Sequence, residues 1–135
     1  MTRPAGIVAA YPWDYAQPDF FLTRFWSAVS AATGARAAGD ERGRWRLCSL
    51  DRTGRTIPTG QHGTWTIHIE TTFLSADELW EGFLLGVGPS GAYATDLRPE
   101  RAAEVRACLY ARLPVTSDRS VHLTATALAM AGTSP

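Results

Sequence analysis

Hydrophobic and polar side chains alternate along two stretches of the chain, residues 64–71 and 121–130. In the first, Trp65, Ile67 and Ile69 alternate with Thr66, His68 and Glu70; in the second, Val121, Leu123, Ala125 and Ala127 alternate with His122, Thr124 and Thr126. Successive side chains of a strand point to opposite faces, so this pattern predicts strands with one face in solvent. The matching alternation predicts that the two strands are antiparallel neighbours.

A third strand is predicted at residues 5–11, where Ala-Gly-Ile-Val-Ala-Ala-Tyr forms a continuous apolar run. Such a run is typical of a strand that is covered on both faces, and strands of this kind are usually parallel and interior. Because the run begins almost at residue 1, little preceding chain remains to supply a neighbour on one side. We therefore expect an exposed strand edge at residues 5–11, and self-association through that edge.

Apolar residues that recur at helical spacing predict three helices, at residues 18–33, 75–86 and 98–113. Pro18 and Pro99 stand near the beginning of the first and third helices, where proline is favoured. The three strands and three helices together predict an α/β fold, formed by a single domain that spans residues 1–135.

The helix at 75–86 has the most complete start signal in the chain. Ser75 can cap its N-terminus, Glu78 can reach back to the amide of Ser75, and Leu74 can pack on Leu79. The sequence from Gly86 to Gly91 then matches G-x-G-x-x-G, but a helix precedes it where a dinucleotide fingerprint requires a strand. We interpret Gly86 as the end of the helix and the residues after it as a turn.

Residues 35–63 are rich in glycine and arginine and predict a long surface loop, in which the arginines either contact an anionic substrate or are simply solvated. Thirteen basic residues balance thirteen acidic ones, which gives no reason to expect a nucleic-acid partner. Cys48 and Cys108 lack metal-ligand spacing and are interpreted as reduced thiols of a cytoplasmic protein. No apolar run approaches the length of a membrane span, and none suggests a signal peptide.

Candidate chemistry is sparse. The chain has no G-x-S-x-G nucleophile motif, its three histidines lack the spacing of metal ligands, and no catalytic residue can be named. Trp13, Asp14 and Tyr15 follow the predicted strand at 5–11, and ligands of open α/β sheets bind beyond the carboxyl ends of strands. These three residues are therefore candidates for substrate binding. Alternatively, the two aromatic rings pack over the sheet edge while Asp14 caps a turn.

Several weak motifs, taken in order, resemble the C-terminal half of class I S-adenosylmethionine-dependent methyltransferases that act on small molecules. They are Arg3-Pro-Ala-Gly, Trp13-Asp-Tyr, Phe25-Trp, Arg44-Trp-Arg-Leu-Cys, Thr72-Phe, Asp77-Glu-Leu-Trp-Glu-Gly-Phe-Leu, Leu97-Arg-Pro-Glu-Arg-Ala and the closing alternating strand. The resemblance implies part of a Rossmann-like sheet, S-adenosylmethionine as the family's cofactor, and a small methyl acceptor bordered by Trp13, Asp14 and Tyr15. The family's cofactor-binding segments would precede the first residue of this chain, and residues 51–63 cannot form the family's helix because they contain Pro58 and several glycines.

Three functions follow from these observations. The first is a methyltransferase-like protein that does not bind S-adenosylmethionine alone, is inactive alone, and either needs a complementary chain or is a gene remnant. The second is a free-standing module for binding small molecules or proteins, with a pocket lined by Trp13, Tyr15, Trp65 and Trp80. The third, a complete methyltransferase, would bind S-adenosylhomocysteine without a partner.

Overall fold

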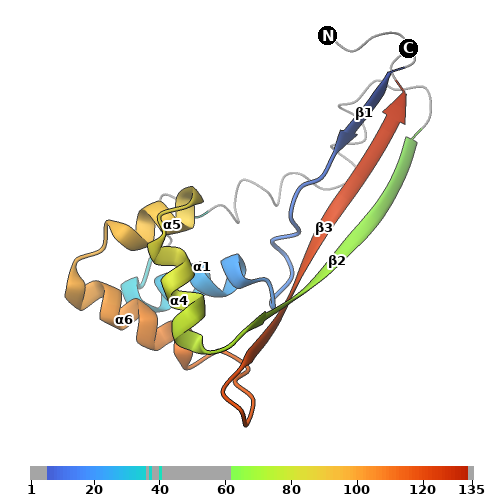
Figure 1. Cartoon of the computed structure of the whole chain (residues 1–135). Helices are drawn as coiled ribbons and strands as arrows, with labels where there is room; N and C mark the ends of the chain where they lie inside the picture. Colours follow the sequence, from blue (N-terminus) through green and yellow to red (C-terminus); the bar gives the residue numbers. More distant parts are fainter. Residues whose placement is uncertain (1–5, 36, 38–39, 41–61, 134–135) are drawn as a thin grey trace.

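The computed structural model describes residues 6–35, 37, 40 and 62–133. Its elements in chain order are β1 (Ile7–Ala10), α1 (Phe21–Thr33), β2 (His62–Phe73), α4 (Ala76–Leu84), α5 (Gly88–Thr95), α6 (Pro99–Tyr110) and β3 (Val121–Thr133). The strands form one antiparallel sheet in the order β1-β3-β2. The helices gather at one end of this sheet, and the strands extend away from them (Figure 1).

The predicted antiparallel pair is confirmed and is longer than expected. β2 pairs with β3 along its whole length, from His62 opposite Gly132 to Phe73 opposite Val121. The register places apolar side chains opposite one another, with Ile67 beside Ala127. The shared alternation of the two strands therefore matches the observed pairing, because residues directly opposite each other point to the same face.

The parallel, interior strand predicted at residues 5–11 is wrong. β1 pairs antiparallel with β3, with Ile7 opposite Thr133, and it lies at an edge of the described sheet. Its side chains alternate between exposed and half-buried, and 76 % of Ile7 is exposed. A short apolar run cannot by itself distinguish a central strand from an edge strand made of small residues, since both tolerate alanine and valine. The described sheet contains no parallel pair, so the Rossmann-like arrangement is not confirmed.

All three predicted helices exist, with shorter bounds than expected. α1 begins at Phe21 because residues 18–20 form a turn, and it ends at Gly34, whose φ of 67° is the left-handed conformation that favours glycine. The side chain of Ser75 caps α4 by accepting a hydrogen bond from the Glu78 amide at 3.2 Å. The carboxylate of Glu78 accepts from the amide of Leu74 rather than that of Ser75.

The contact of Leu74 with Leu79 stays a prediction; 78 % of Leu74 is exposed, whereas Leu79 is buried. The turn predicted after Gly86 is wrong: residues from Gly88 onward form α5. Gly86 itself follows the end of α4 with a φ of 73°, as expected for a glycine that ends a helix. Sequence periodicity missed α5 because this short helix has no apolar stripe.

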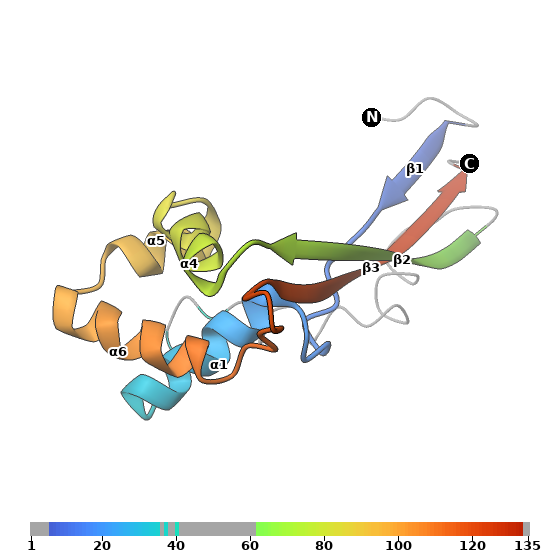
Figure 2. The ribbon, with the colours of Figure 1, turned by 60° about the horizontal axis from the view of Figure 1, so that its bottom comes forward.

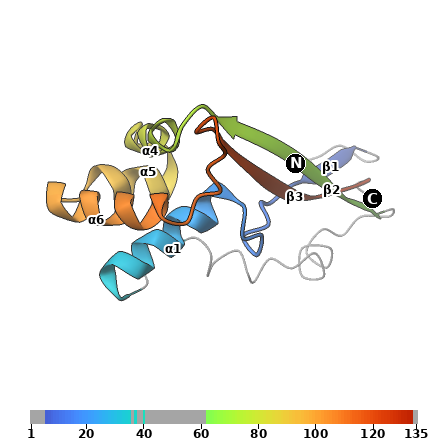
Figure 3. The same ribbon diagram turned by 90° about the horizontal axis from the view of Figure 1, so that it is seen from below.

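The hydrophobic core lies between the helices and the end of the sheet beside them. Figures 2 and 3 show the helices gathered at that end of the sheet. The buried residues of this core come from α1, α4, α5, α6 and β3: Phe25, Trp26, Ala28, Val29, Leu79, Trp80, Phe83, Ala94, Val105, Leu109, Val121 and Leu123. The Phe25 and Phe83 rings are stacked with centroids 4.3 Å apart, and Trp26 contacts Tyr93 at 5.4 Å. These aromatic contacts hold α1 against α4 and α5.

Candidate functional site

Trp13, Asp14 and Tyr15 lie where the chain passes from β1 to α1. Trp13 forms an isolated antiparallel bridge with Ala127, and the amide of Asp14 donates to the Thr126 carbonyl at 2.7 Å. The Asp14 carboxylate accepts hydrogen bonds from the Ala16 amide and the Gln17 side chain, both at 2.9 Å. Asp14 therefore stabilises a turn.

The two aromatic rings of this segment pack against α1. The Trp13 and Tyr15 rings lie 5.4 and 5.3 Å from the ring of Phe20, and Tyr15 is buried. This arrangement matches the alternative in which the rings cover the sheet and Asp14 caps a turn, and the substrate-binding role of the three residues stays a prediction. None of the three cavities described below is lined by Trp13, Asp14 or Tyr15.

The best candidate for a binding site is a cavity of about 440 Å³ between the sheet and the helices. Its lining residues come from α1, β2, α4 and the beginning of α5: Phe21, Leu22, Thr71, Phe73, Leu79, Gly82, Phe83, Val87, Gly88, Pro89 and Ser90. We call this the phenylalanine cavity. Its volume lies within the range of about 300–1,000 Å³ that is usual for small-molecule sites.

Each phenylalanine of this cavity is positioned by a different element. Phe21 is the first residue of α1, Phe73 is the last of β2, and Phe83 lies on the buried face of α4. The ring centroids of Phe21 and Phe83 lie 6.2 Å apart, and the Phe83 ring also stacks on that of Phe25 in the hydrophobic core. The walls are therefore anchored in the hydrophobic core, which favours a preformed site.

The lining contains no charged side chain, and its side-chain polar groups are the hydroxyls of Thr71 and Ser90. An ionised ligand would lose hydration there without gaining a charged partner, so the chemistry favours an uncharged, largely apolar molecule. Gly82 lies in the cavity wall, and a Cβ atom added to it would meet nothing within 4 Å. The volume and lining suit the binding of a ligand, and the lining side chains include no nucleophile with an adjacent base.

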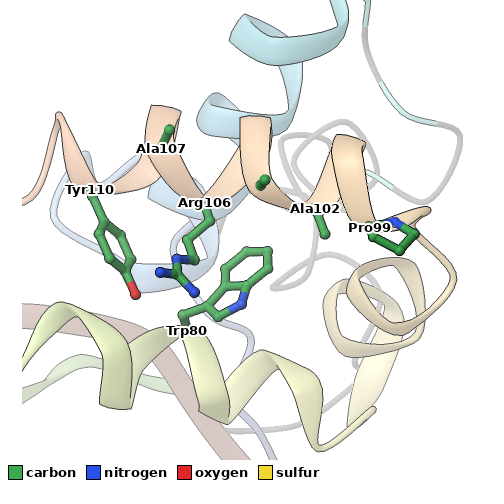
Figure 4. Close-up of a pocket in the computed structure, with 7 residues that line it drawn as sticks. Trp80, Pro99, Ala102, Arg106, Ala107 and Tyr110 are labelled. Carbon is green, nitrogen blue, oxygen red and sulfur yellow. The ribbon is translucent and has the colours of Figure 1, made fainter.

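A second cavity, of about 500 Å³, lies between α4 and α6 (Figure 4). It is lined by Trp80, Pro99, Ala102, Ala103, Arg106, Ala107 and Tyr110. The Arg106 guanidinium carbon lies 5.4 Å from the centre of the Tyr110 ring, and the Tyr110 hydroxyl donates to the carboxylate of Asp77. Burial, together with the hydrogen bond to Asp77 and the charge of that carboxylate, raises the pKa of Tyr110 to about 12. This tyrosine is therefore a neutral structural donor at neutral pH.

A third cavity, of about 700 Å³, borders α5 and is lined by Gly86, Pro89, Ala92, Tyr93, Thr95 and Asp96. It shares Pro89 with the phenylalanine cavity but offers a single phenol and a single carboxylate among small residues. We therefore place the candidate site in the phenylalanine cavity.

The histidines of the paired strands do not meet. His68 bonds Thr126 at 3.1 Å, and His122 bonds Thr72 at 3.0 Å and Ser120 at 3.1 Å. Within the part of the chain that the structure describes, no group of three or more His, Cys, Asp or Glu side chains could hold a metal ion. The helices among these residues are also too short or too polar to cross a membrane.

Of the four aromatic residues expected to line a pocket, Trp80 alone lines one of the three cavities described here, the one between α4 and α6. Phe21, Phe73 and Phe83 were each visible as apolar positions at the end of a predicted strand or on a helical stripe. Their convergence on one cavity could not be inferred, since it depends on how three elements pack. Cys108 is free, whereas Cys48 and nearly all of the predicted loop at 35–63 lie outside the described residues.

The sequence was also compared with known proteins. No family model matches this chain, and a search of curated proteins finds no similar sequence.

Proposed function

We propose that this protein is a binding module for a small, uncharged, largely apolar molecule, which it holds in the phenylalanine cavity. The single observation that carries the proposal is the lining: three phenylalanine rings from three elements, two hydroxyl groups and no charge. Apolar surface with a few convergent polar groups is the usual composition of a small-molecule site. Thr71 and Ser90 would orient a ligand that carries one hydroxyl or carbonyl group.

The proposal is tested with 2-naphthol as an uncharged aromatic probe and 2-naphthoate as its anionic counterpart. Methyl NMR spectra of the protein are recorded during titration, because Leu22, Leu79 and Val87 place methyl groups in the cavity wall. We expect saturable shifts of these methyl signals with 2-naphthol and much weaker binding of 2-naphthoate. The absence of any saturable shift with 2-naphthol would contradict the proposal.

Two matched variants localise the binding. Gly82→Leu adds a side chain at the wall of the phenylalanine cavity, and we expect it to weaken 2-naphthol binding about tenfold, or about 1.4 kcal/mol. Ala103→Leu adds similar bulk to the cavity between α4 and α6 and should leave the affinity unchanged. The reverse result would place the ligand between α4 and α6 instead.

A methyltransferase-like function is a second proposal, and it depends on the order of the sequence motifs rather than on the geometry. The described sheet lacks the parallel strands of that family, so the topology adds no support. The proposal predicts that S-adenosylhomocysteine binds only when a complementary chain is present. Calorimetric detection of tight binding to the isolated chain would favour a complete enzyme.

A further inference from the structure

The outer edge of β2 is the longest strand edge left unpaired within the described part of the sheet. The order β1-β3-β2 places β2 at one edge, and its twelve residues contain neither proline nor lysine. Natural proteins usually protect an edge strand with such residues or by keeping it short, as in β1 with its four residues. An edge of this length without protection is a template for pairing with another strand.

The side chains of β2 also leave apolar surface uncovered. Trp65, Ile67 and Ile69 lie on one face and are 48 %, 40 % and 41 % exposed, whereas their β3 neighbours Ala125, Ala127 and Ala129 are buried. An additional strand beside β2 would cover these side chains from the open edge. From Gly63 to Phe73 the ionisable residues are His68 and Glu70 alone, so like-charge repulsion is minimal.

We propose that a second copy of this chain pairs with β2, antiparallel and about a two-fold axis at Ile69. In this register Glu70 of each copy lies opposite His68 of the other, and Trp65 lies opposite Phe73. Opposite residues share a face, so the apolar faces and the polar faces of the two copies are continuous. Placing Ile67 on the axis instead would set Glu70 opposite Thr64 and lose the hydrogen-bonding pair of Glu70 with His68.

The contacts within one copy suit this pairing. His68 uses Nδ1 to bond the Thr126 hydroxyl on β3, so Nε2 is the ring nitrogen available to Glu70 of the second copy. Phe73 and Thr71 line the phenylalanine cavity, and the register sets Trp65 and Ile67 of the second copy opposite them. The second copy would thus add an indole beside the cavity, although the pairing itself does not depend on ligand binding.

Sedimentation equilibrium of the full chain over a range of concentrations measures the association. We expect a reversible dimer whose dissociation constant rises about tenfold in Glu70→Arg, because arginine cannot accept the hydrogen bond that each Glu70 carboxylate would accept from His68 of the other copy. The double variant His68→Glu/Glu70→His exchanges the two groups and should restore the dimer. A wild-type monomer at all concentrations, or a dimer that Glu70→Arg leaves intact, would overturn the proposal.

Disulfide trapping determines the register in a background where Cys48 and Cys108 are replaced by serine. A cysteine introduced by Ile69→Cys faces its own copy across the axis and should form a covalent dimer on mild oxidation. The matched Ile67→Cys variant should not, since its two copies would be about 14 Å apart along the strand direction. Cross-linking through position 67 in preference to position 69 would overturn the proposed axis. Circular dichroism of each variant confirms that it folds.

Discussion

The hydroxyl of Tyr110, at the end of α6, donates a hydrogen bond to the carboxylate of Asp77, in the first turn of α4. The two residues are 33 positions apart in the sequence. Their hydrogen bond joins the first and last helices of the α4–α5–α6 segment, beside the cavity that Arg106 and Trp80 also line. This hydrogen bond connects α4 with α6, and its contribution to stability depends on pH.

Tyr110 should make the stability of the protein decrease in strongly alkaline solution. Its pKa is raised from 10.0 to about 12 in the folded state, so the neutral phenol is favoured by folding. The corresponding stabilisation is complete below pH 10 and is lost as the pH rises toward about 12. Urea unfolding at several pH values should show this loss in the wild type and a smaller one in Tyr110→Phe. Equal losses in the two proteins would contradict this origin.

Gly82 and Gly91 should respond in opposite ways to alanine. Gly82 lies in α4 with open space around an added Cβ, so Gly82→Ala should raise the free energy of unfolding by about 0.5–1 kcal/mol. A Cβ on Gly91 would lie 2.7 Å from the carbonyl carbon of Gly86, so Gly91→Ala should lower it by about 1–3 kcal/mol. Chemical denaturation of both variants measures the difference. Stabilisation by Gly91→Ala would show that α4 and α5 are not in this close contact.

Arg119 has a left-handed backbone conformation, with a φ of 71°, in the turn before β3. A residue with a Cβ atom pays about 1–2 kcal/mol for this conformation, whereas glycine adopts it freely but loses more entropy on folding. Arg119→Gly should therefore raise the free energy of unfolding by about 0.5–1 kcal/mol. Arg119→Ala is the control, because it removes the charge but retains the Cβ and should give no such increase.

Asp118 stabilises the same turn, and this stabilisation depends on pH. Its carboxylate accepts hydrogen bonds from the Thr116 hydroxyl and from the hydroxyl and amide of Ser120, which lower its pKa from 3.8 to about 2. The stabilisation is present above pH 4 and is lost as the pH falls toward about 2. Denaturation across this range should show a smaller decrease in stability for Asp118→Asn than for the wild type. A parallel decrease would exclude Asp118 as its source.

The sequence predicted best those strands and helix ends whose signal lies within a few neighbouring residues. The alternation from Trp65 to Glu70 and from Val121 to Thr126 was sufficient to predict the paired strands. The cap at Ser75 and the glycine at position 86 located the two ends of the helix predicted at 75–86, because their hydrogen bonds and dihedral angles are local. The same reasoning failed for the direction of β1, since the direction of a strand is set by a neighbour distant in sequence.

By itself, the sequence determined where the three strands and the helices α1, α4 and α6 form, because periodicity, capping residues and glycines act within a few positions along the chain. Only the tertiary structure decided that β1 pairs antiparallel with β3, that Gly88–Thr95 is a helix, and that Phe21, Phe73 and Phe83 surround one cavity. The physical reason is that a cavity is a property of packing: its walls are defined by distances between elements, and those distances arise only when the elements bury their apolar surfaces against each other.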